Sequence, residues 1–225
     1  MTYAPLTPRE YRRFRRRQFW NDHGIFRELF YANFHEIAPG IFRSAQPSPE
    51  QLRRWHARHG FRTVLNIRAP APHESHFRLE QEICDQLGIR HVLLPGFGSR
   101  DLPDRSSLLT ALDLLPSLER PVLLHCKSGA DRAGIISALC LHALFRIPVR
   151  EAAGQLRLWP FGHIRQANTG ILDWFFRSFE QAEARAPGLT LRQWVESGYD
   201  REALLRSFHP WYSLDWITDR LLRRE

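Results

Sequence analysis

Residues 121–145 read PVLLHCKSGADRAGIISALCLHALF, and they predict the central unit of the fold. PVLL at 121–124 predicts a fully apolar strand, and AGIISALCLHALF at 133–145 predicts a central, buried helix because it is apolar nearly all round. A strand that leads through a short loop into a helix is typical of a parallel sheet covered on both faces.

A helix with clear end signals is predicted over 47–60. Ser48 is a candidate N-cap, Pro49 lies in the first turn, and Gln51 completes a capping box. Gly60 follows the last turn as a stop signal.

Strands and helices alternate through the middle of the chain. FRTVLNI at 61–67 and IRHVLL at 89–94 predict strands, separated by a second helix that ends at Gly88. PGFGSRDLPD at 95–104 is a Gly/Pro-rich loop before a helix over 107–115. We therefore expect an α/β fold with a central, mostly parallel sheet flanked by helices.

The rest of the chain reads as helix only, over 150–158, 169–182 and 190–222. The domain organisation expected from these patterns has three parts. They are a basic N-terminal helical extension at 1–36, a core domain at 37–185 and a helical C-terminal extension at 186–225 packed on it.

The composition of the 225 residues is that of an ordinary globular protein, with 43% hydrophobic and 25% charged residues. Disordered, collagen-like and disulfide-scaffold classes are therefore excluded. No apolar run approaches the ~20 residues that span a membrane. The start of the chain lacks the layout of a signal peptide, and three cysteines are too few for a disulfide framework. We therefore expect a soluble, cytoplasmic protein in a reducing compartment.

The net charge is +8, which raises the question of nucleic acid or an anionic membrane as a partner. Lys127 is the only lysine, so arginine carries almost all the positive charge. Phosphate backbones do not require arginine over lysine, so we favour a coding bias and expect no nucleic acid partner.

The N-terminal segment REYRRFRRRQFW at 9–20 contains six arginines and four aromatic residues. It is compatible with a helix that lies on an anionic membrane surface. We favour a helix whose aromatic side packs on the domain while its arginines stay solvated.

Cysteine spacing alone does not locate a site. Every cysteine is followed six residues later by an arginine, in the pairs Cys84 and Arg90, Cys126 and Arg132, and Cys140 and Arg146. Cys84 and Cys140 fall inside helical patterns, where the amides point along the axis and cannot surround an anion. Both are expected to be apolar filler.

Cys126 differs because it follows a buried strand and its loop leads into a helix. Such a loop lies at the carboxyl edge of the sheet, where α/β proteins bind ligands, and the helix N-terminus favours an anion. Gly129 and Ala130 let the backbone curl, so that successive amides can form an anion nest. Arg132 can grip two phosphate oxygens, and Lys127 lies in the same loop.

HCKSGADRAG at 125–134 resembles the signature loop of the cysteine-dependent protein tyrosine phosphatase superfamily, and the layout resembles its dual-specificity-like branch in a bacterial form. The segments at 40–52, 66–68 and 168–176 are similar to stretches that these phosphatases carry. The resemblance covers residues 37–182.

The resemblance implies a role for each matching residue. Cys126 would be the thiolate nucleophile, Arg132 would bind the substrate phosphate, and His125 would hold the loop and the thiolate. An aspartate on the preceding loop would be the general acid. We choose Asp101, because Asp104 stands where the next helix needs an N-cap.

The remaining candidates surround the same loop. The expected phosphate-binding set is Lys127, Ser128, Gly129, Ala130, Asp131 and His125. Candidates for lining the pocket, each equally explained by ordinary structural roles, are Arg43, Ser44, Arg68, His163 and Gln166. Ala133 departs from the superfamily, which usually has a hydroxyl there to help the thiolate leave.

The sequence thus predicts a phosphomonoester phosphatase that acts through a phosphocysteine intermediate. Its substrate would be a phosphorylated protein or a small phosphomonoester, with a lipid or sugar phosphate as an alternative. A non-catalytic phosphate-binding module is the other alternative. No cofactor and no metal are expected.

Overall fold

A computed structural model describes residues 4–21 and 24–210 of the chain. Its single sheet has the strand order β1-β2-β5-β3-β4. The strands are β1 (His35–Ala38), β2 (Ile41–Ser44), β3 (Thr63–Asn66), β4 (Arg90–Leu93) and β5 (Val122–His125). Only β1 is antiparallel to its neighbour, so the predicted mostly parallel sheet is confirmed.

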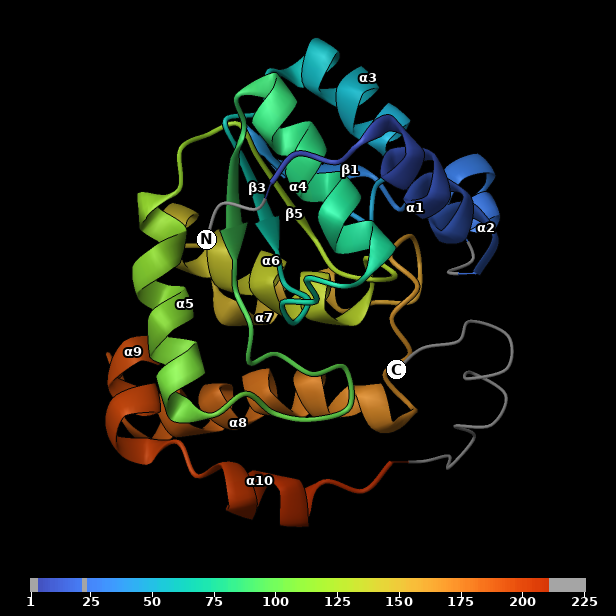
Figure 1. Cartoon of the computed structure of the whole chain (residues 1–225). Helices are drawn as coiled ribbons and strands as arrows, with labels where there is room; N and C mark the ends of the chain where they lie inside the picture. Colours follow the sequence, from blue (N-terminus) through green and yellow to red (C-terminus); the bar gives the residue numbers. More distant parts are fainter. Residues whose placement is uncertain (1–3, 22–23, 211–225) are drawn as a thin grey trace.

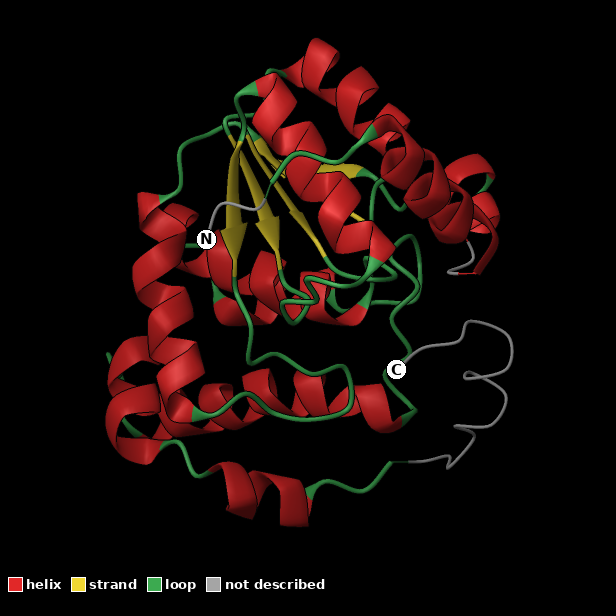
Figure 2. Cartoon of the chain, in the orientation of Figure 1, coloured by secondary structure: helices red, strands yellow, loops and turns green. Residues whose placement is uncertain are grey.

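Helices cover both faces of this sheet (Figures 1 and 2). The helices before β5 are α1 (Pro8–Asn21), α2 (Gly24–Leu29), α3 (Pro49–His59), α4 (Ser75–Leu87) and α5 (Arg105–Ser117). Those after it are α6 (Asp131–Phe145), α7 (Val149–Ala152), α8 (Ile171–Arg185), α9 (Leu191–Gln193) and α10 (Arg201–Ser207).

Successive side chains of each strand point to opposite faces of the sheet, and each face has its own hydrophobic core. Val64 of β3 and Leu123 of β5 are buried in the cluster formed with α3 and α4. Their neighbours Leu65 and Leu124 are buried in the larger cluster formed with α5, α6 and α8. Successive strand residues point to opposite faces, so each strand contributes to both cores. No helix in the described ranges is long and apolar enough to cross a bilayer.

The predicted caps are present. Ser48 and Gln51 form a reciprocal capping box on α3, and Gly60 ends the helix in the left-handed conformation at φ 66°. Gly88 ends α4 in the same way at φ 66°. The Asp104 side chain accepts a hydrogen bond from Ser107 N and caps α5.

Two helical predictions are wrong in extent. The helix predicted over 150–158 is only α7 followed by a 3-10 turn over Ala153–Gln155, because the chain turns inward to bury Leu156. The helix predicted over 190–222 is broken, since a π-helical turn ends at Gly198 and Asp200 caps a new helix. The part beyond 210 lies outside the described residues.

Ser48→Ala should destabilise the protein by about 1 kcal/mol, because the amide of Gln51 loses its cap. Chemical denaturation measures this as a lower midpoint with an unchanged slope. Ser48→Asp retains an acceptor and serves as the control. Equal stability of the alanine variant and the wild type would contradict the assigned cap.

Candidate active site

The backbone carbonyl groups of the loop between β5 and α6 point away from the centre of the loop, toward the surrounding protein. Each of the carbonyls of residues 127–130 accepts a hydrogen bond from the surrounding scaffold. The pairs are Gln46 N to Lys127 O (3.2 Å), Asn33 Nδ2 to Ser128 O (3.1 Å), and Arg43 Nη2 to Gly129 O (2.6 Å) and to Ala130 O (3.0 Å).

This arrangement sets the direction of the loop amides. In a trans peptide the N–H of one residue points opposite to the carbonyl of the residue before it. The N–H groups of residues 128–131 therefore face away from the scaffold, although Ser128 Oγ also lies 3.4 Å from the amide of Ala130. Successive amides on one side of a curled loop form a nest for an anion, and the start of α6 adds the positive end of its dipole.

Gly129 is required by this path. Its φ is +72°, and a Cβ there would lie 2.6 Å from the backbone of Ser44 and Ala45. The loop therefore presses against the end of β2 with no room for a side chain.

The guanidinium of Arg43 supports this loop from within the protein. Its side chain is fully buried, and its guanidinium lies 4.1 Å from the Phe161 ring centroid. Nη1 donates to the main-chain and side-chain oxygens of Gln155, both at 2.9 Å. Burial lowers the pKa of Arg43 to about 10, so the group stays charged near neutral pH. Sequence reasoning placed Arg43 near the pocket but missed that it holds the loop.

The two central predicted residues lie where the motif requires. Cys126 directly follows β5 and is 2% exposed. Arg132, in the first turn of α6, is partly exposed. Within the described ranges its guanidinium has no hydrogen-bond or ion-pair partner, which leaves it available to a ligand.

His125 is buried on a carboxylate. Its Nε2 lies 3.0 Å from Glu80 Oε1, and that oxygen is also 2.7 Å from His91 Nε2. Burial would raise the pKa of Glu80, but the two histidines lower it well below its ordinary value. Glu80 was missed from the sequence, although an acidic residue beside Leu79 on the buried side of a helix was the available signal.

Asp131 contributes its main chain to the nest, and its side chain points into the protein. The carboxylate is buried and lies 2.8 Å from His163 Nδ1. His163 Nε2 is in turn 2.7 Å from Asp173 of α8, which also accepts from Arg165 Nε at 2.6 Å. His163 therefore links the start of α6 to α8.

The candidate acids are both engaged. The N–H of Ser107 and the hydroxyl of Ser106 hold the pKa of Asp104 below its usual value, which fits its capping role. Asp101 does not cap α5, as expected, but both its oxygens lie 2.6 Å from Arg201 Nη2 of α10. The sequence did not reveal this contact, because Arg201 follows Asp101 by a hundred residues.

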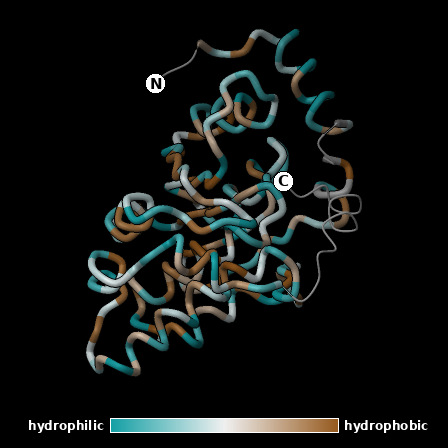
Figure 3. The backbone as a smooth tube through the Cα atoms, turned by 90° about the horizontal axis from the view of Figure 1, so that it is seen from below, coloured by the Kyte–Doolittle hydropathy of each residue, from teal (hydrophilic) through white to brown (hydrophobic). Residues whose placement is uncertain are grey.

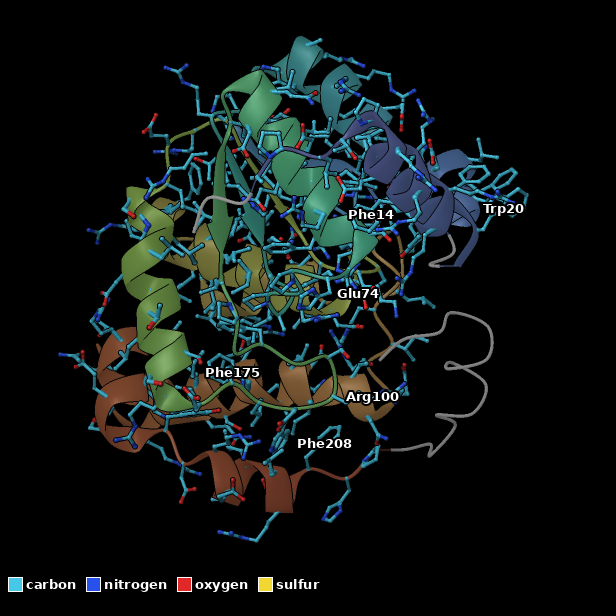
Figure 4. The ribbon with its side chains drawn as sticks, viewed as in Figure 1. Phe14, Trp20, Glu74, Arg100, Phe175 and Phe208 are labelled. Atoms are coloured by element: carbon cyan, nitrogen blue, oxygen red, sulfur yellow. The ribbon has the colours of Figure 1, made fainter. Side chains whose placement is uncertain are left out.

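Tyr199 and Arg201 contact residues 101–103 of the acid loop, the segment 99–104 before α5. Arg201 Nε donates to Leu102 O at 2.9 Å, and the Tyr199 hydroxyl donates to Pro103 O at 2.6 Å. Figure 4 shows Arg100 of this loop in front of α8, above Phe208 of the extension.

The other lining candidates have structural roles. Ser44 is buried, with its hydroxyl donating to Ala45 O at 2.7 Å. Arg68 donates to Gln46 Oε1 at 3.1 Å. Gln166 is exposed and lines a separate hollow between α8 and α10.

Cys84 and Cys140 are buried in helices, as expected of apolar filler. Burial raises the pKa of Cys84 well above its ordinary value and that of Cys140 to about 12, so neither is a thiolate. The described residues contain no group of three or more His, Cys, Asp and Glu side chains arranged to hold a metal ion.

Residues 99–145 match the sequence model of the Tyrosine phosphatase family. This segment contains the acid loop, α5, β5, the Cys126 loop and α6. Over these residues the chain is similar to tyrosine phosphatases. This match confirms the resemblance seen around the Cys126 loop.

Among solved phosphatase structures, TpbA shares the fold of this chain. TpbA from P. aeruginosa is 22% identical with a TM-score of 0.51, and the match covers 65% of this chain and 84% of TpbA. A mouse dual specificity phosphatase crystallised with zinc tungstate is 15% identical with a TM-score of 0.48, over 72% of this chain and 96% of that one. Human DUSP28 is 13% identical with a TM-score of 0.48, over 68% and 95% of the two chains.

Gly129→Ala in this phosphatase should destabilise the fold by more than about 1 kcal/mol, because alanine is strained at positive φ. Tungstate binding, measured by calorimetry, should weaken by roughly 100-fold as the nest is displaced. Gly154→Ala, where a Cβ meets nothing within 4 Å, is the control. Unchanged tungstate binding in Gly129→Ala would contradict the described path of the loop.

His163 should titrate above 6.5. Burial would lower its pKa, but hydrogen bonds to Asp131 and Asp173 outweigh burial and raise it. A pKa that is higher in the folded chain means that this pairing stabilises the fold fully below about pH 6.5, and the contribution is lost as pH rises through the folded value.

Asp173→Asn should lower the pKa of His163, which NMR titration of the imidazole measures directly. Glu183→Gln, on the exposed side of the same helix, should leave it unchanged. A His163 that titrates below 6.5 in the wild type would show that burial dominates and that the described pairing is wrong.

Proposed function

We propose that this phosphatase hydrolyses phosphomonoesters through a phosphocysteine intermediate on Cys126. The observation that supports this most is the outward turn of the loop carbonyls, since it leaves the amides of residues 128–131 to surround a phosphoryl group. Phosphoryl transfer spreads negative charge over three equatorial oxygens, and fixed donors that match this charge lower the barrier.

Cys126 would attack phosphorus as a thiolate, and the bond from phosphorus to the leaving oxygen would break. The phosphoryl group then rests on Sγ until water displaces it, so one difficult displacement becomes two easier ones. Arg132 would bind two equatorial oxygens through its planar guanidinium, which has no competing partner in the described chain.

Asp101 would protonate the leaving oxygen and afterwards take a proton from the attacking water. To do so its carboxyl group must leave Arg201. The pair is solvent-exposed, with the side chains 54% and 32% accessible, and such pairs contribute only about 0–1 kcal/mol. Releasing Asp101 is therefore a small part of an enzymatic barrier.

The substrate would be a phosphorylated protein or a small phosphomonoester. A lipid or sugar phosphate is an alternative, since Lys127 makes the loop more basic. A non-catalytic phosphate-binding module is the second candidate function, and one observation favours it: Ala133, fully buried in the first turn of α6, offers no hydroxyl to assist departure of the thiolate.

The experiment that tests the proposed function is hydrolysis of an aryl phosphate in the presence of a chelator. Wild type should turn over, and Cys126→Ser should be inactive but still bind tungstate. The hydrolysis rate of Asp101→Asn should fall about 10² to 10³-fold for a substrate with an alkyl leaving group and much less for one that releases nitrophenolate. General acid catalysis matters most for poor leaving groups.

Asp104→Asn retains a capping acceptor and is the matched control. Any loss of its hydrolysis rate should depend little on the leaving group. Inactivity of both wild type and Cys126→Ser, together with tungstate binding by both, would favour the binding module. Activity that survives in Cys126→Ser would contradict the assigned nucleophile.

Breakdown of the phosphoenzyme should be slower than its formation, because Ala133 supplies no hydroxyl to the leaving thiolate. Rapid-quench measurements should then show a burst of released alcohol before the steady state. Ala133→Thr should raise the steady-state rate and shrink the burst. Absence of a burst, or a threonine variant with unchanged turnover, would contradict this order of steps.

A further inference from the structure

The large apolar side chains that are exposed in the described chain fall in two segments, one with residues 20, 29 and 30 and one with residues 158 and 159. The two segments meet beside the phosphate loop, the segment 126–132 that carries Cys126. These side chains are Trp20 (64% exposed), Leu29 (64%), Phe30 (76%), Leu158 (66%) and Trp159 (86%). Apolar residues gathered on one part of a surface indicate an interaction site, whereas scattered ones need no explanation.

Hydrogen bonds join these two segments to each other and to the site. Tyr31 Oη donates to Phe161 O at 3.1 Å, which ties the residue after Phe30 to the turn that follows Trp159. Asn33 Nδ2 donates both to Phe161 O at 3.0 Å and to Ser128 O at 3.1 Å. The apolar segments are thus anchored to the loop that carries Cys126.

A cationic stripe on α1 continues this surface. Arg13, Arg16, Arg17 and Trp20 follow the spacing i, i+3, i+4, i+7, which places them on one face of the helix, and together they line a shallow hollow of about 430 Å³. Arg17 lies 3.7 Å from Glu74, Arg13 interacts electrostatically with Glu10, and within the described ranges Arg16 has no acidic partner. Figure 4 shows Trp20 at the outer edge of the molecule, and Figure 3 shows α1, next to the N label, mostly in hydrophilic teal.

The helix that carries the stripe is fixed to the domain. Arg15 Nη2 lies 2.5 Å from Glu28 and 2.8 Å from Glu50, which joins α1 to α2 and α3. Tyr11 packs against the core cluster beneath α3. The interpretation favoured from the sequence, a helix packed on the domain, therefore holds for this side of α1 but leaves the stripe and Trp20 outward.

We propose that this surface docks on an anionic lipid bilayer and brings the phosphate loop to the membrane. Arginines are attracted to lipid phosphates, and tryptophan favours the boundary between headgroups and acyl chains. Leu29, Leu158 and Trp159 would enter the same boundary. A nucleic acid would satisfy the arginines but leave these apolar side chains in water, so the combination favours a bilayer.

Vesicle sedimentation with the full chain tests this surface. Wild type should bind vesicles of equimolar phosphatidylglycerol and phosphatidylcholine, should bind phosphatidylcholine alone far more weakly, and should be released by salt. The triple variant Arg13→Gln, Arg16→Gln, Arg17→Gln should partition roughly 100-fold less, since each basic residue near such a surface contributes about fivefold. Trp159→Ala should weaken binding without altering its salt dependence.

The matched control removes the same charge from the last turn of α3 and the amino ends of β3 and β4, at the other end of the strands from the Cys126 loop: Arg58→Gln, Arg62→Gln and Arg90→Gln, all exposed. This variant should bind the anionic vesicles like wild type. Aryl phosphate hydrolysis and the unfolding midpoint should be unchanged in both triple variants, which separates loss of docking from loss of fold.

Three results would overturn the proposal. The α1 variant and the control could bind alike, which would assign the binding to net charge. Wild type could bind neutral vesicles as well as anionic ones. It could also bind duplex DNA more tightly than anionic vesicles at the same salt concentration, which would assign the stripe to nucleic acid. None of these results depends on whether the protein turns over a phosphomonoester.

Discussion

The buried guanidinium of Arg43 constrains the architecture around the site. A charge removed from water needs hydrogen-bond acceptors, and here Nη2 donates to the carbonyls of Gly129 and Ala130 and Nη1 to Gln155, while Nε has no hydrogen-bond partner. Parallel pairing of β2 with β5 places Arg43 beside Leu124, directly before the loop. This buried cation therefore fixes the direction of two of the four peptides whose amides would bind phosphate, those that carry the amides of Ala130 and Asp131.

The two loops of the candidate site are held by different kinds of contact. The loop between β5 and α6 is held by buried or half-buried contacts from several sides: Asn33 from the N-terminal segment, Glu80 through His125, and His163 through Asp131. The acid loop is held by the exposed ion pair of Asp101 with Arg201 and by less exposed hydrogen bonds from Tyr199 and Arg201 to its main chain. In the proposed mechanism, the loop that would bind phosphate stays fixed while the carboxylate of Asp101 leaves Arg201.

The sequence predicted what depends on local chemistry. The capping box of α3, the N-cap of α5 and the strand–loop–helix unit around Cys126 follow from residue types at short spacing, and the structure contains all three. It did not predict contacts between distant segments. The burial of Arg43 depends on Gln155 and Phe161, and Asp101 meets Arg201 only through tertiary packing. Periodicity also overestimated the helix after residue 150, because burial of Leu156 outweighed helix propensity.

The central claim is that Arg43 orients the loop so that its amides receive an oxyanion. An NMR titration of ¹⁵N-labelled protein with tungstate, in wild type and in Arg43→Met, tests it most directly. The account predicts saturable shifts of the amides of Ser128, Gly129, Ala130 and Asp131 in the wild type, and their loss in the folded Arg43→Met variant. Tungstate shifts that leave these amides unmoved, or that are identical in Arg43→Met, would contradict it.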